Sequence, residues 1–204
     1  MEARGELDQA AAQYRHMLAQ MEDLVMGQPH NADWVEYLGL AHNNLGKLAV
    51  MRGDLAEAVA QYNADERIQS GLAAAEPKNM SRRDNLLTVR AILGRTQALT
   101  GDLVAGMARL QQAVDMATQL GTLDPSNTDF QEHAALYATQ LARLRRLSGD
   151  LPAATALMTR ALPIFADLAR HDPDNAAWQR EYAEALVEQS AQGREAGKQE
   201  EAHE

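Results

Sequence analysis

Apolar residues recur at helical spacing along this chain. Between residues 31 and 52 an apolar side chain appears every three or four positions, at Trp34, Leu38, Ala41, Leu45 and Leu48. A second series runs between residues 54 and 75, at Leu55, Ala58, Val59, Tyr62, Ile68 and Leu72. This spacing places each series on one face of an α-helix. The pattern therefore predicts two amphipathic helices that bury their apolar faces against each other.

The polar residues between the two series predict where these helices start and stop. Asn31 is a favoured helix N-cap, because its side chain accepts hydrogen bonds from the first free backbone amides. Gly53 is suited to the left-handed conformation that ends a helix, and Asp54 can cap the next one. Pro77 disfavours helical geometry at the residue before it. A turn this short predicts an antiparallel helix pair.

The whole arrangement repeats every 48 residues without insertion or deletion. Glycines lie at the same point of each copy, and so do prolines that are followed two residues later by asparagine: Gly5, Gly53, Gly101, Gly149; Pro29, Pro77, Pro125, Pro173. A fixed period of this length is typical of stacked helical repeats. Helices are expected at about 6–27, 31–52, 54–75, 79–100, 102–123, 127–148, 150–171 and 175–195, with ends uncertain by ~2–4 residues.

These features predict an all-α fold, a solenoid of about eight long helices in antiparallel pairs. We expect a single solenoid over residues 1–204. It would consist of a half-repeat at 5–28, full repeats at 29–76, 77–124 and 125–172, a half-repeat at 173–196 and a polar tail at 197–204. Half-repeats at both ends suggest a segment of a longer protein.

The centre of each copy resembles a tetratricopeptide repeat. The Leu-Gly pair of that pattern corresponds to Leu45-Gly46 and Leu93-Gly94, and its Ala-x3-aromatic pair to Ala58 and Tyr62. The usual repeat has about 34 residues, so each copy here is longer by about seven residues, or two turns, per helix. The resemblance implies a right-handed superhelix with a concave groove that is lined by the first helix of each pair.

The long repeat, opened most clearly by Asp172-Pro173 with Asn175 and Trp178, is similar to C-terminal regions of bacterial serine/threonine kinases and transcriptional regulators. That similarity implies a regulatory or sensor region of a bacterial signalling protein. The compartment stays open: the cytoplasm, or the periplasm if the parent protein is a membrane-anchored sensor.

Composition removes several classes of function. The net charge of −10 gives no electrostatic driving force for nucleic-acid binding. The chain has no cysteine, and no run of apolar residues is long enough to span a membrane. The histidines lack zinc-ligand spacing, and no phosphate loop or catalytic constellation occurs. We therefore expect no enzyme activity, no cofactor and no metal site.

The groove positions implied by the family supply candidate binding residues. They are Asn43, Lys47, Arg95, Thr139, Arg143, Arg146 and Arg194. Lys47, Arg95 and Arg143 occupy one repeat position, and such a basic row could bind an acidic peptide or a C-terminal carboxylate. The alternative is that these cations favour helix C-termini or pair with neighbouring acids.

The leading hypothesis is a protein-interaction scaffold that binds a peptide or protein segment, possibly acidic, in its groove. One alternative is a domain that senses a small molecule or peptide and changes its superhelical pitch. Another is self-association through the end repeats, where the apolar residues Leu7, Tyr14, Leu18 and Leu24 are expected to be poorly covered.

Overall fold

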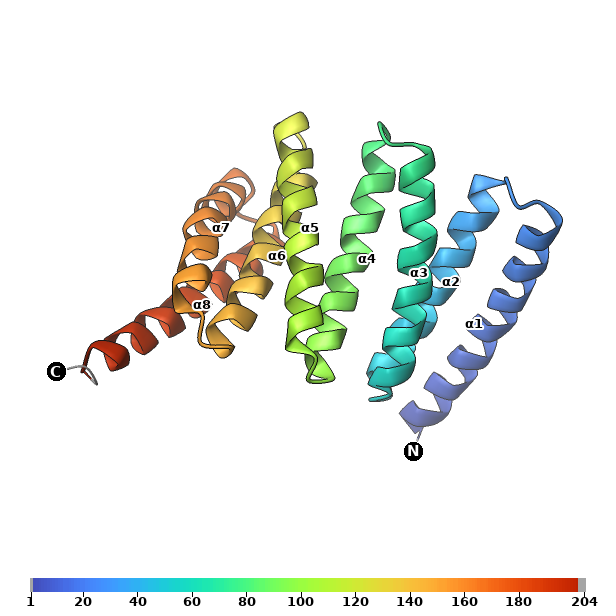
Figure 1. Ribbon diagram of the computed structural model, residues 1–204, viewed down its shortest axis with the longest axis horizontal. Coiled ribbons are helices and arrows are strands. Elements are labelled where there is room, and N and C mark those ends of the chain that lie inside the picture. The colour runs from blue at the N-terminus through green and yellow to red at the C-terminus, as the bar shows by residue number, and fades with distance from the viewer. Residues whose placement is uncertain (1, 202–204) are drawn as a thin grey trace. The chain divides into compact units, whose positions relative to one another are not determined.

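Every regular element that the structure describes is an α-helix (Figure 1). This computed structural model describes residues 2–201 of the backbone and the side chains of residues 7–198. The helices are α1 (Glu2–Gly27), α2 (Ala32–Met51), α3 (Leu55–Ala75), α4 (Met80–Leu99), α5 (Leu103–Leu123), α6 (Thr128–Leu147), α7 (Leu151–His171) and α8 (Ala176–Glu201). The prediction of an all-α repeat fold is confirmed.

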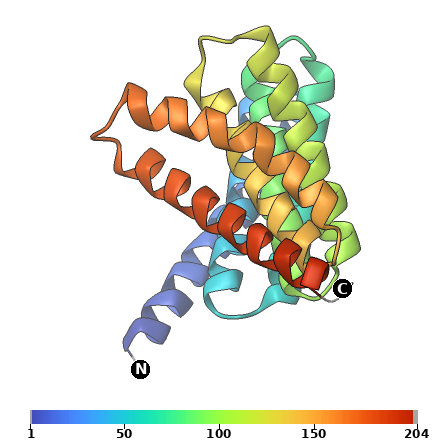
Figure 2. The same ribbon diagram turned by 90° about the vertical axis from the view of Figure 1, so that its left-hand side faces the viewer.

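The helices group into two compact units, Met1–Asp102 with α1 to α4 and Leu103–Glu204 with α5 to α8. In the first unit each helix packs against the next one along the chain. The second unit has the same arrangement, and α6 also packs against α8. Figure 2 shows α7 and α8 lying antiparallel, joined by a short turn. Because the chain divides into two units, a single solenoid over residues 1–204 stays a prediction.

The predicted caps are confirmed in detail. The side-chain oxygen of Asn31 accepts hydrogen bonds from the backbone amides of Asp33 and Trp34 at 3.1 and 3.3 Å. The same role falls to the asparagine at the equivalent point of the other copies: Asn79, Asn127, Asn175. The Asp54 carboxylate accepts from the amide of Glu57 at 3.1 Å and starts α3. These bonds satisfy amides that have no partner inside the helix.

Left-handed glycines end the first helix of three pairs. Gly53, Gly101 and Gly149 have φ angles of 76°, 94° and 86°, a conformation that costs any other residue about 1–2 kcal/mol. Gly5, at the equivalent sequence position, instead lies inside α1, which begins at Glu2. A turn was expected there from the sequence period alone.

The last helix is longer than expected. α8 continues to Glu201, whereas the sequence predicted a helix end near 195 and a polar tail from 197. Gly197 is followed by Lys198, which cannot cap a new helix as the aspartate of a Gly-Asp turn does. Of the predicted tail, residues 202–204 lie outside the described residues.

Close helix crossings form the core of each unit. Ala49, Ala58, Tyr62 and Leu93 form a buried cluster in the first unit. The ring of Tyr62 lies over Gly46, where an added Cβ would come within 2.6 Å of Cε1. In the second unit Leu141, Ala154, Met158 and Phe165 are almost completely buried. No helix in the described part is long and apolar enough to cross a membrane.

Candidate functional site

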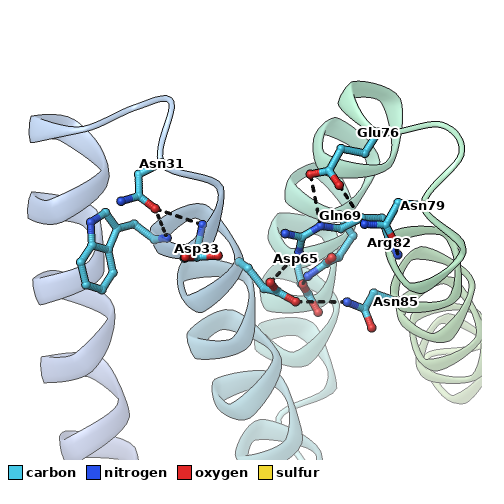
Figure 3. Close-up of polar contacts among 10 residues, drawn as sticks. Asn31, Asp33, Asp65, Gln69, Glu76, Asn79, Arg82 and Asn85 are labelled. Carbon is cyan, nitrogen blue, oxygen red and sulfur yellow. Dashed lines mark hydrogen bonds and ion pairs between the residues drawn. The ribbon is translucent and has the colours of Figure 1, made fainter.

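A pocket of about 410 Å³ opens between α2, α3 and α4 in the first unit. We call it the α2–α4 pocket; it is lined by Asp33, Glu36, Tyr37, Leu40, Asn43, Asp65, Gln69, Asn85, Thr88 and Val89. α2 and α4 are the first helices of their pairs, so this is the side on which the family resemblance places ligands. Figure 3 labels four of its polar lining residues, Asp33, Asp65, Gln69 and Asn85.

Two buried polar side chains of α3 form the floor of the pocket. Asp65 is 3% exposed and Gln69 is 7% exposed. Asn43 of α2 donates a hydrogen bond from Nδ2 to Oδ2 of Asp65 at 2.9 Å, and Gln69 donates from Nε2 to Oδ1 at 3.2 Å. The floor is therefore a small hydrogen-bonded network that joins α2 to α3.

Burial raises the pKa of the Asp65 carboxyl above its ordinary value. The hydrogen bonds from Asn43 and Gln69 oppose this shift, and so do the nearby charges of His42 and Lys47. Desolvation disfavours the charged form of a carboxyl, whereas donors and cations favour it. A cation that entered the pocket would therefore stabilise the Asp65 carboxylate.

The carbonyl oxygen of Gln69 has no hydrogen-bond partner. Its Oε1 atom is buried, while its Nε2 atom is occupied by Asp65. Leaving a buried acceptor unpaired costs about 1–3 kcal/mol. The pocket floor thus has an acceptor that is suited to a donor from a bound ligand.

Gly39 allows α2 to lie against this floor. A Cβ at position 39 would come within 2.9 Å of both Asp65 Oδ1 and Gln69 Nε2. Distances below 3.0 Å are not found for real Cβ atoms, so a larger residue would displace the network. The glycine is required here by close approach and not by an unusual backbone conformation.

Glu36 forms the rim between α2 and α4. It pairs with Arg82 Nη1 at 2.5 Å and accepts a hydrogen bond from Asn85 Nδ2 at 3.2 Å (Figure 3). Arg82 also lies 3.8 Å from Glu76, which in turn accepts from Asn79 at the start of α4. These contacts hold the first helices of two successive pairs together beside the pocket.

The pocket is lined by acidic and apolar side chains together. Its lining includes the carboxyl groups of Asp33, Glu36 and Asp65, and none of its lining residues is basic. Tyr37 and Leu40 are 47% and 44% exposed on α2. Among the described residues, no group of three or more histidines or carboxylates could hold a metal ion. The site is therefore suited to an organic group with a donor-rich end and an apolar part.

The second unit contains the repeat equivalent of this pocket, but it is almost closed. A pocket of about 40 Å³ is lined there by Leu136, Thr139, Gln140, Arg143, Phe165, Glu181 and Glu184. Thr139, Phe165 and Glu181 lie 96 residues, or two periods, after Asn43, Gln69 and Asn85. Phe165 therefore stands at the repeat position of Gln69. The open polar pocket is thus a property of the first unit.

The predicted groove residues of the first unit separate into two groups. Asn43 lines the α2–α4 pocket and binds Asp65. Lys47 and Arg95 are exposed and lie outside its lining. Arg95 is close enough to Tyr62 to lower the pKa of its hydroxyl, which burial raises more strongly. A ligand-binding role for Lys47 and Arg95 stays a prediction.

The predicted cations of the second unit are used largely within the fold. Arg146 pairs with Glu188 at 2.7 Å and with Glu195 at 2.6 Å, and Arg143 lies 3.5 Å from Glu188. Pairing with neighbouring acids was the alternative to ligand binding for these two arginines, and both contact the same acid. That acid, Glu188, is buried.

The other two predicted residues of this unit also make contacts within the unit. The hydroxyl of buried Thr139 donates to the Ala135 carbonyl at 2.9 Å. Exposed Arg194 donates to the Ser190 hydroxyl, also at 2.9 Å. A ligand-binding role for Thr139 and Arg194 stays a prediction.

Sequence reasoning did not find Asp65 and Gln69. The apolar series of this helix was continued past them to Leu72, because only apolar residues were counted. The signal was present in the repeat: the equivalents of Asp65 are Met17, Ala113 and Ala161, and those of Gln69 are Met21, Ala117 and Phe165. Polar residues replace apolar ones at both core positions in this copy alone.

Comparison with solved structures supports the fold. The chain is similar to the nearly identical TPR-like repeats of a Podosopora anserina protein described as a kinesin light chain. The TM-score is 0.62 at 20% identity, over 96% of this chain and 84% of that one. A Q17M form of the same protein gives 0.62 and 20%, over 98% and 86%.

BtubC from P. vanneervenii has a TM-score of 0.43 at 15% identity, over 95% of this chain and 92% of that one. The likeness to the Podosopora anserina repeats shows a tetratricopeptide-like helical repeat fold. No protein-family profile matches the chain. No curated protein matches it either.

Proposed function

We propose that this chain is a non-catalytic protein-interaction module, and that the α2–α4 pocket binds a segment of a partner protein. Tetratricopeptide-like repeats generally serve as protein-interaction scaffolds, and the likeness of this chain to such repeats supports the proposal. The observation that carries the proposal is the composition of the pocket. Exposed Tyr37 and Leu40 stand beside a few buried polar groups, the combination that is typical of ligand pockets.

An extended peptide fits this arrangement better than a compact ligand. The pocket opens between two successive first helices, and the Glu36–Arg82 and Glu36–Asn85 contacts fix their separation. Aromatic side chains provide much of the binding energy at protein interfaces, and Tyr37 is available for this role. A regulatory region of a bacterial signalling protein remains our proposal for the parent protein, on the resemblance of the long repeat.

Selection from a displayed library of random linear peptides tests this function. We expect peptides to be enriched on the full chain, and their affinity to fall at least about tenfold, or ~1.4 kcal/mol, in a Tyr37→Ala/Leu40→Ala variant. Leu99→Ala is the control, since Leu99 is an exposed apolar residue at the end of α4 and outside the pocket. If the peptides bind the double variant with unchanged affinity, the pocket is not their binding site. If no peptide is enriched, the proposed interaction function is contradicted.

A further inference from the structure

We propose that the α2–α4 pocket recognises an organic cation, namely the ammonium or guanidinium group of a lysine or arginine side chain of the partner. This inference rests on the proposed function and names the chemistry that the pocket selects. It departs from the acidic partner that the basic row suggested.

Charge is the first argument. Asp33, Glu36 and Asp65 line one pocket without a basic lining residue, in a chain whose net charge is −10. A concave site with carboxylates on low-dielectric walls concentrates a potential of one sign and attracts the opposite charge. Glu36 is partly neutralised by Arg82. Asp65 accepts hydrogen bonds from the neutral side chains of Asn43 and Gln69, and the charges of His42 and Lys47 act on it from outside the pocket lining.

Unused hydrogen-bond acceptors on the floor are the second argument. Gln69 is more than nine-tenths buried, lines the pocket, and its Oε1 atom has no partner. Oδ2 of Asp65 accepts a hydrogen bond from Asn43 and Oδ1 accepts one from Gln69, whereas an ionised carboxylate has about four acceptor positions. An ammonium has three donors and a guanidinium has five, so either group can satisfy both residues at once.

The apolar wall is the third argument. Lysine and arginine carry a charged group on an aliphatic stem, and the stem commonly packs on apolar surface. Leu40 offers such a surface, and the ring of Tyr37 can attract a cation over its face. A metal ion would not use this wall, and no group of residues with metal-ligand geometry is present in the described part of the chain.

The closed pocket of the second unit is the fourth argument. There Ala161 and Phe165 stand at the positions of Asp65 and Gln69, and the volume falls from about 410 to about 40 Å³. The repeat therefore folds with an apolar floor. Burying Asp65 and Gln69 at those positions of the first unit has a desolvation cost. Cation binding would explain why polar residues occur there.

Titration of the full chain with small probes tests the inference directly. n-Butylammonium and n-butylguanidinium reproduce the two side-chain ends, and n-butanol is the neutral control of equal length. We expect saturable NMR shifts of the backbone amides of residues 37–43 and 65–69 with both cations, and at least about tenfold weaker binding in Asp65→Asn. Glu22→Gln, an equal charge change at an exposed position on α1, leaves the affinity unchanged.

Three results would overturn the inference: shifts with n-butanol equal to those with the cations, unchanged binding in Asp65→Asn, or equal loss in Glu22→Gln. If Asp65→Asn does not give a folded spectrum, Asp33→Asn at the exposed rim replaces it. That variant is expected to weaken cation binding about two- to fourfold, and an unchanged affinity would count against the inference.

The selected peptides separate this inference from the proposed function. We expect replacement of their lysines by norleucine to abolish binding. Peptides that need Tyr37 and Leu40 but tolerate norleucine would overturn cation recognition and leave the interaction function standing. Conversely, cation probes that depend on Asp65 while no peptide is enriched would support the cation site and overturn the interaction function.

Discussion

Arg146 of α6 forms a two-pronged ion pair with Glu188 of α8. Its Nε donates to Oε1 at 2.7 Å and its Nη2 donates to Oε2 at 3.1 Å, and the pKa of the guanidinium is raised chiefly by these bonds. Glu188 is 1% exposed and also accepts from Gln192 at 3.2 Å. This pair links the first helices of two successive repeats inside the second unit.

Removing one partner of this pair is expected to lower the free energy of unfolding. Arg146→Met leaves the Glu188 carboxylate buried without its main partner, so we expect a loss of about 3–5 kcal/mol in the free energy of unfolding. Arg146→Met/Glu188→Met restores an apolar contact and is expected to recover most of that loss. Urea denaturation of the variants measures both effects.

Arg143→Met serves as the matched control for this pair. Arg143 lies 3.5 Å from the same carboxylate, but its side chain is half exposed, so we expect a change of no more than about 1 kcal/mol. A double variant that is no more stable than Arg146→Met would contradict the view that the uncompensated charge causes the loss.

Glu181 is expected to make the second unit less stable as the pH rises. Burial raises its pKa from 4.5 to about 7, with further increases from the charges of Glu132 and Glu184 and decreases from Arg180 and His133. Between these pKa values the folded state binds more protons than the unfolded state, so the free energy of unfolding falls as pH increases from about 5 to about 7.

Glu181→Gln removes this pH dependence. Its stability relative to wild type is expected to rise between pH 5 and pH 8 by on the order of 1 kcal/mol, after allowance for solvent screening of a half-exposed carboxyl. Thermal melts at several pH values measure the difference. Glu184→Gln removes one of the charges that raise this pKa, so it is expected to weaken the pH dependence only in part. A constant difference across this range would show that Glu181 titrates normally.

Two glycine substitutions are expected to change stability in opposite directions. Gly46→Ala places a Cβ 2.6 Å from Cε1 of Tyr62, which is fixed in the core, so we expect a loss of about 1–3 kcal/mol. Gly71→Ala meets no atom within 4 Å in α3 and is expected to add about 0.5–1 kcal/mol. Denaturant melts measure both; a neutral Gly46→Ala would mean that the helices separate there at little cost.

Binding of n-butylammonium is expected to weaken as the pH falls. The raised pKa of Asp65 means that its carboxylate is protonated at a higher pH than an ordinary aspartate, and protonation removes the charge that attracts the cation. Asn43→Ala removes a donor to the carboxylate, raises this pKa further and shifts the loss of binding to higher pH.

NMR titrations with n-butylammonium at several pH values measure this shift. Other charged or titratable groups also act on the site: Asp33, Glu36, His42 and Lys47 on α2, and Arg82 on α4, which pairs with Glu36. Asp65→Asn is the control, because any pH dependence that persists in it belongs to those groups. An identical pH profile in wild type and Asn43→Ala would exclude Asp65 as the titrating group.

Local chemistry made much of the fold predictable. Asn31 and Asp54 cap helices because of their own side chains, and Gly53 turns the chain because it lacks one. The end of α8 was predicted wrongly because a repeat period says nothing about where the last copy stops. The contacts of the predicted binding residues were harder to predict. Arg146 and Glu188, for example, are 42 residues apart, and only the fold brings them together.

Asp65 and Gln69 show what the sequence contained but helical periodicity did not reveal. They continue the buried face of α3 between Tyr62 and Leu72, and a search for apolar residues passes over them. Comparison between copies identifies them, because three other copies supply the expected residue at each position. That these two buried side chains form the floor of a pocket depends on the close approach of α2 at Gly39 and on the placement of α4, which required the structure.

The residues that line the open pocket and those that line the closed pocket occupy the same positions of the repeat. Side chains that form a binding site in one copy could therefore be introduced at the same positions of another copy. Ala135, Thr139, Ala161 and Phe165 of the second unit correspond to Gly39, Asn43, Asp65 and Gln69. Replacing these four residues of the second unit by their equivalents from the first unit is therefore expected to give a second polar pocket, with the helices unchanged. A chain built in this way can acquire or lose recognition sites one copy at a time, while its remaining copies keep the scaffold folded.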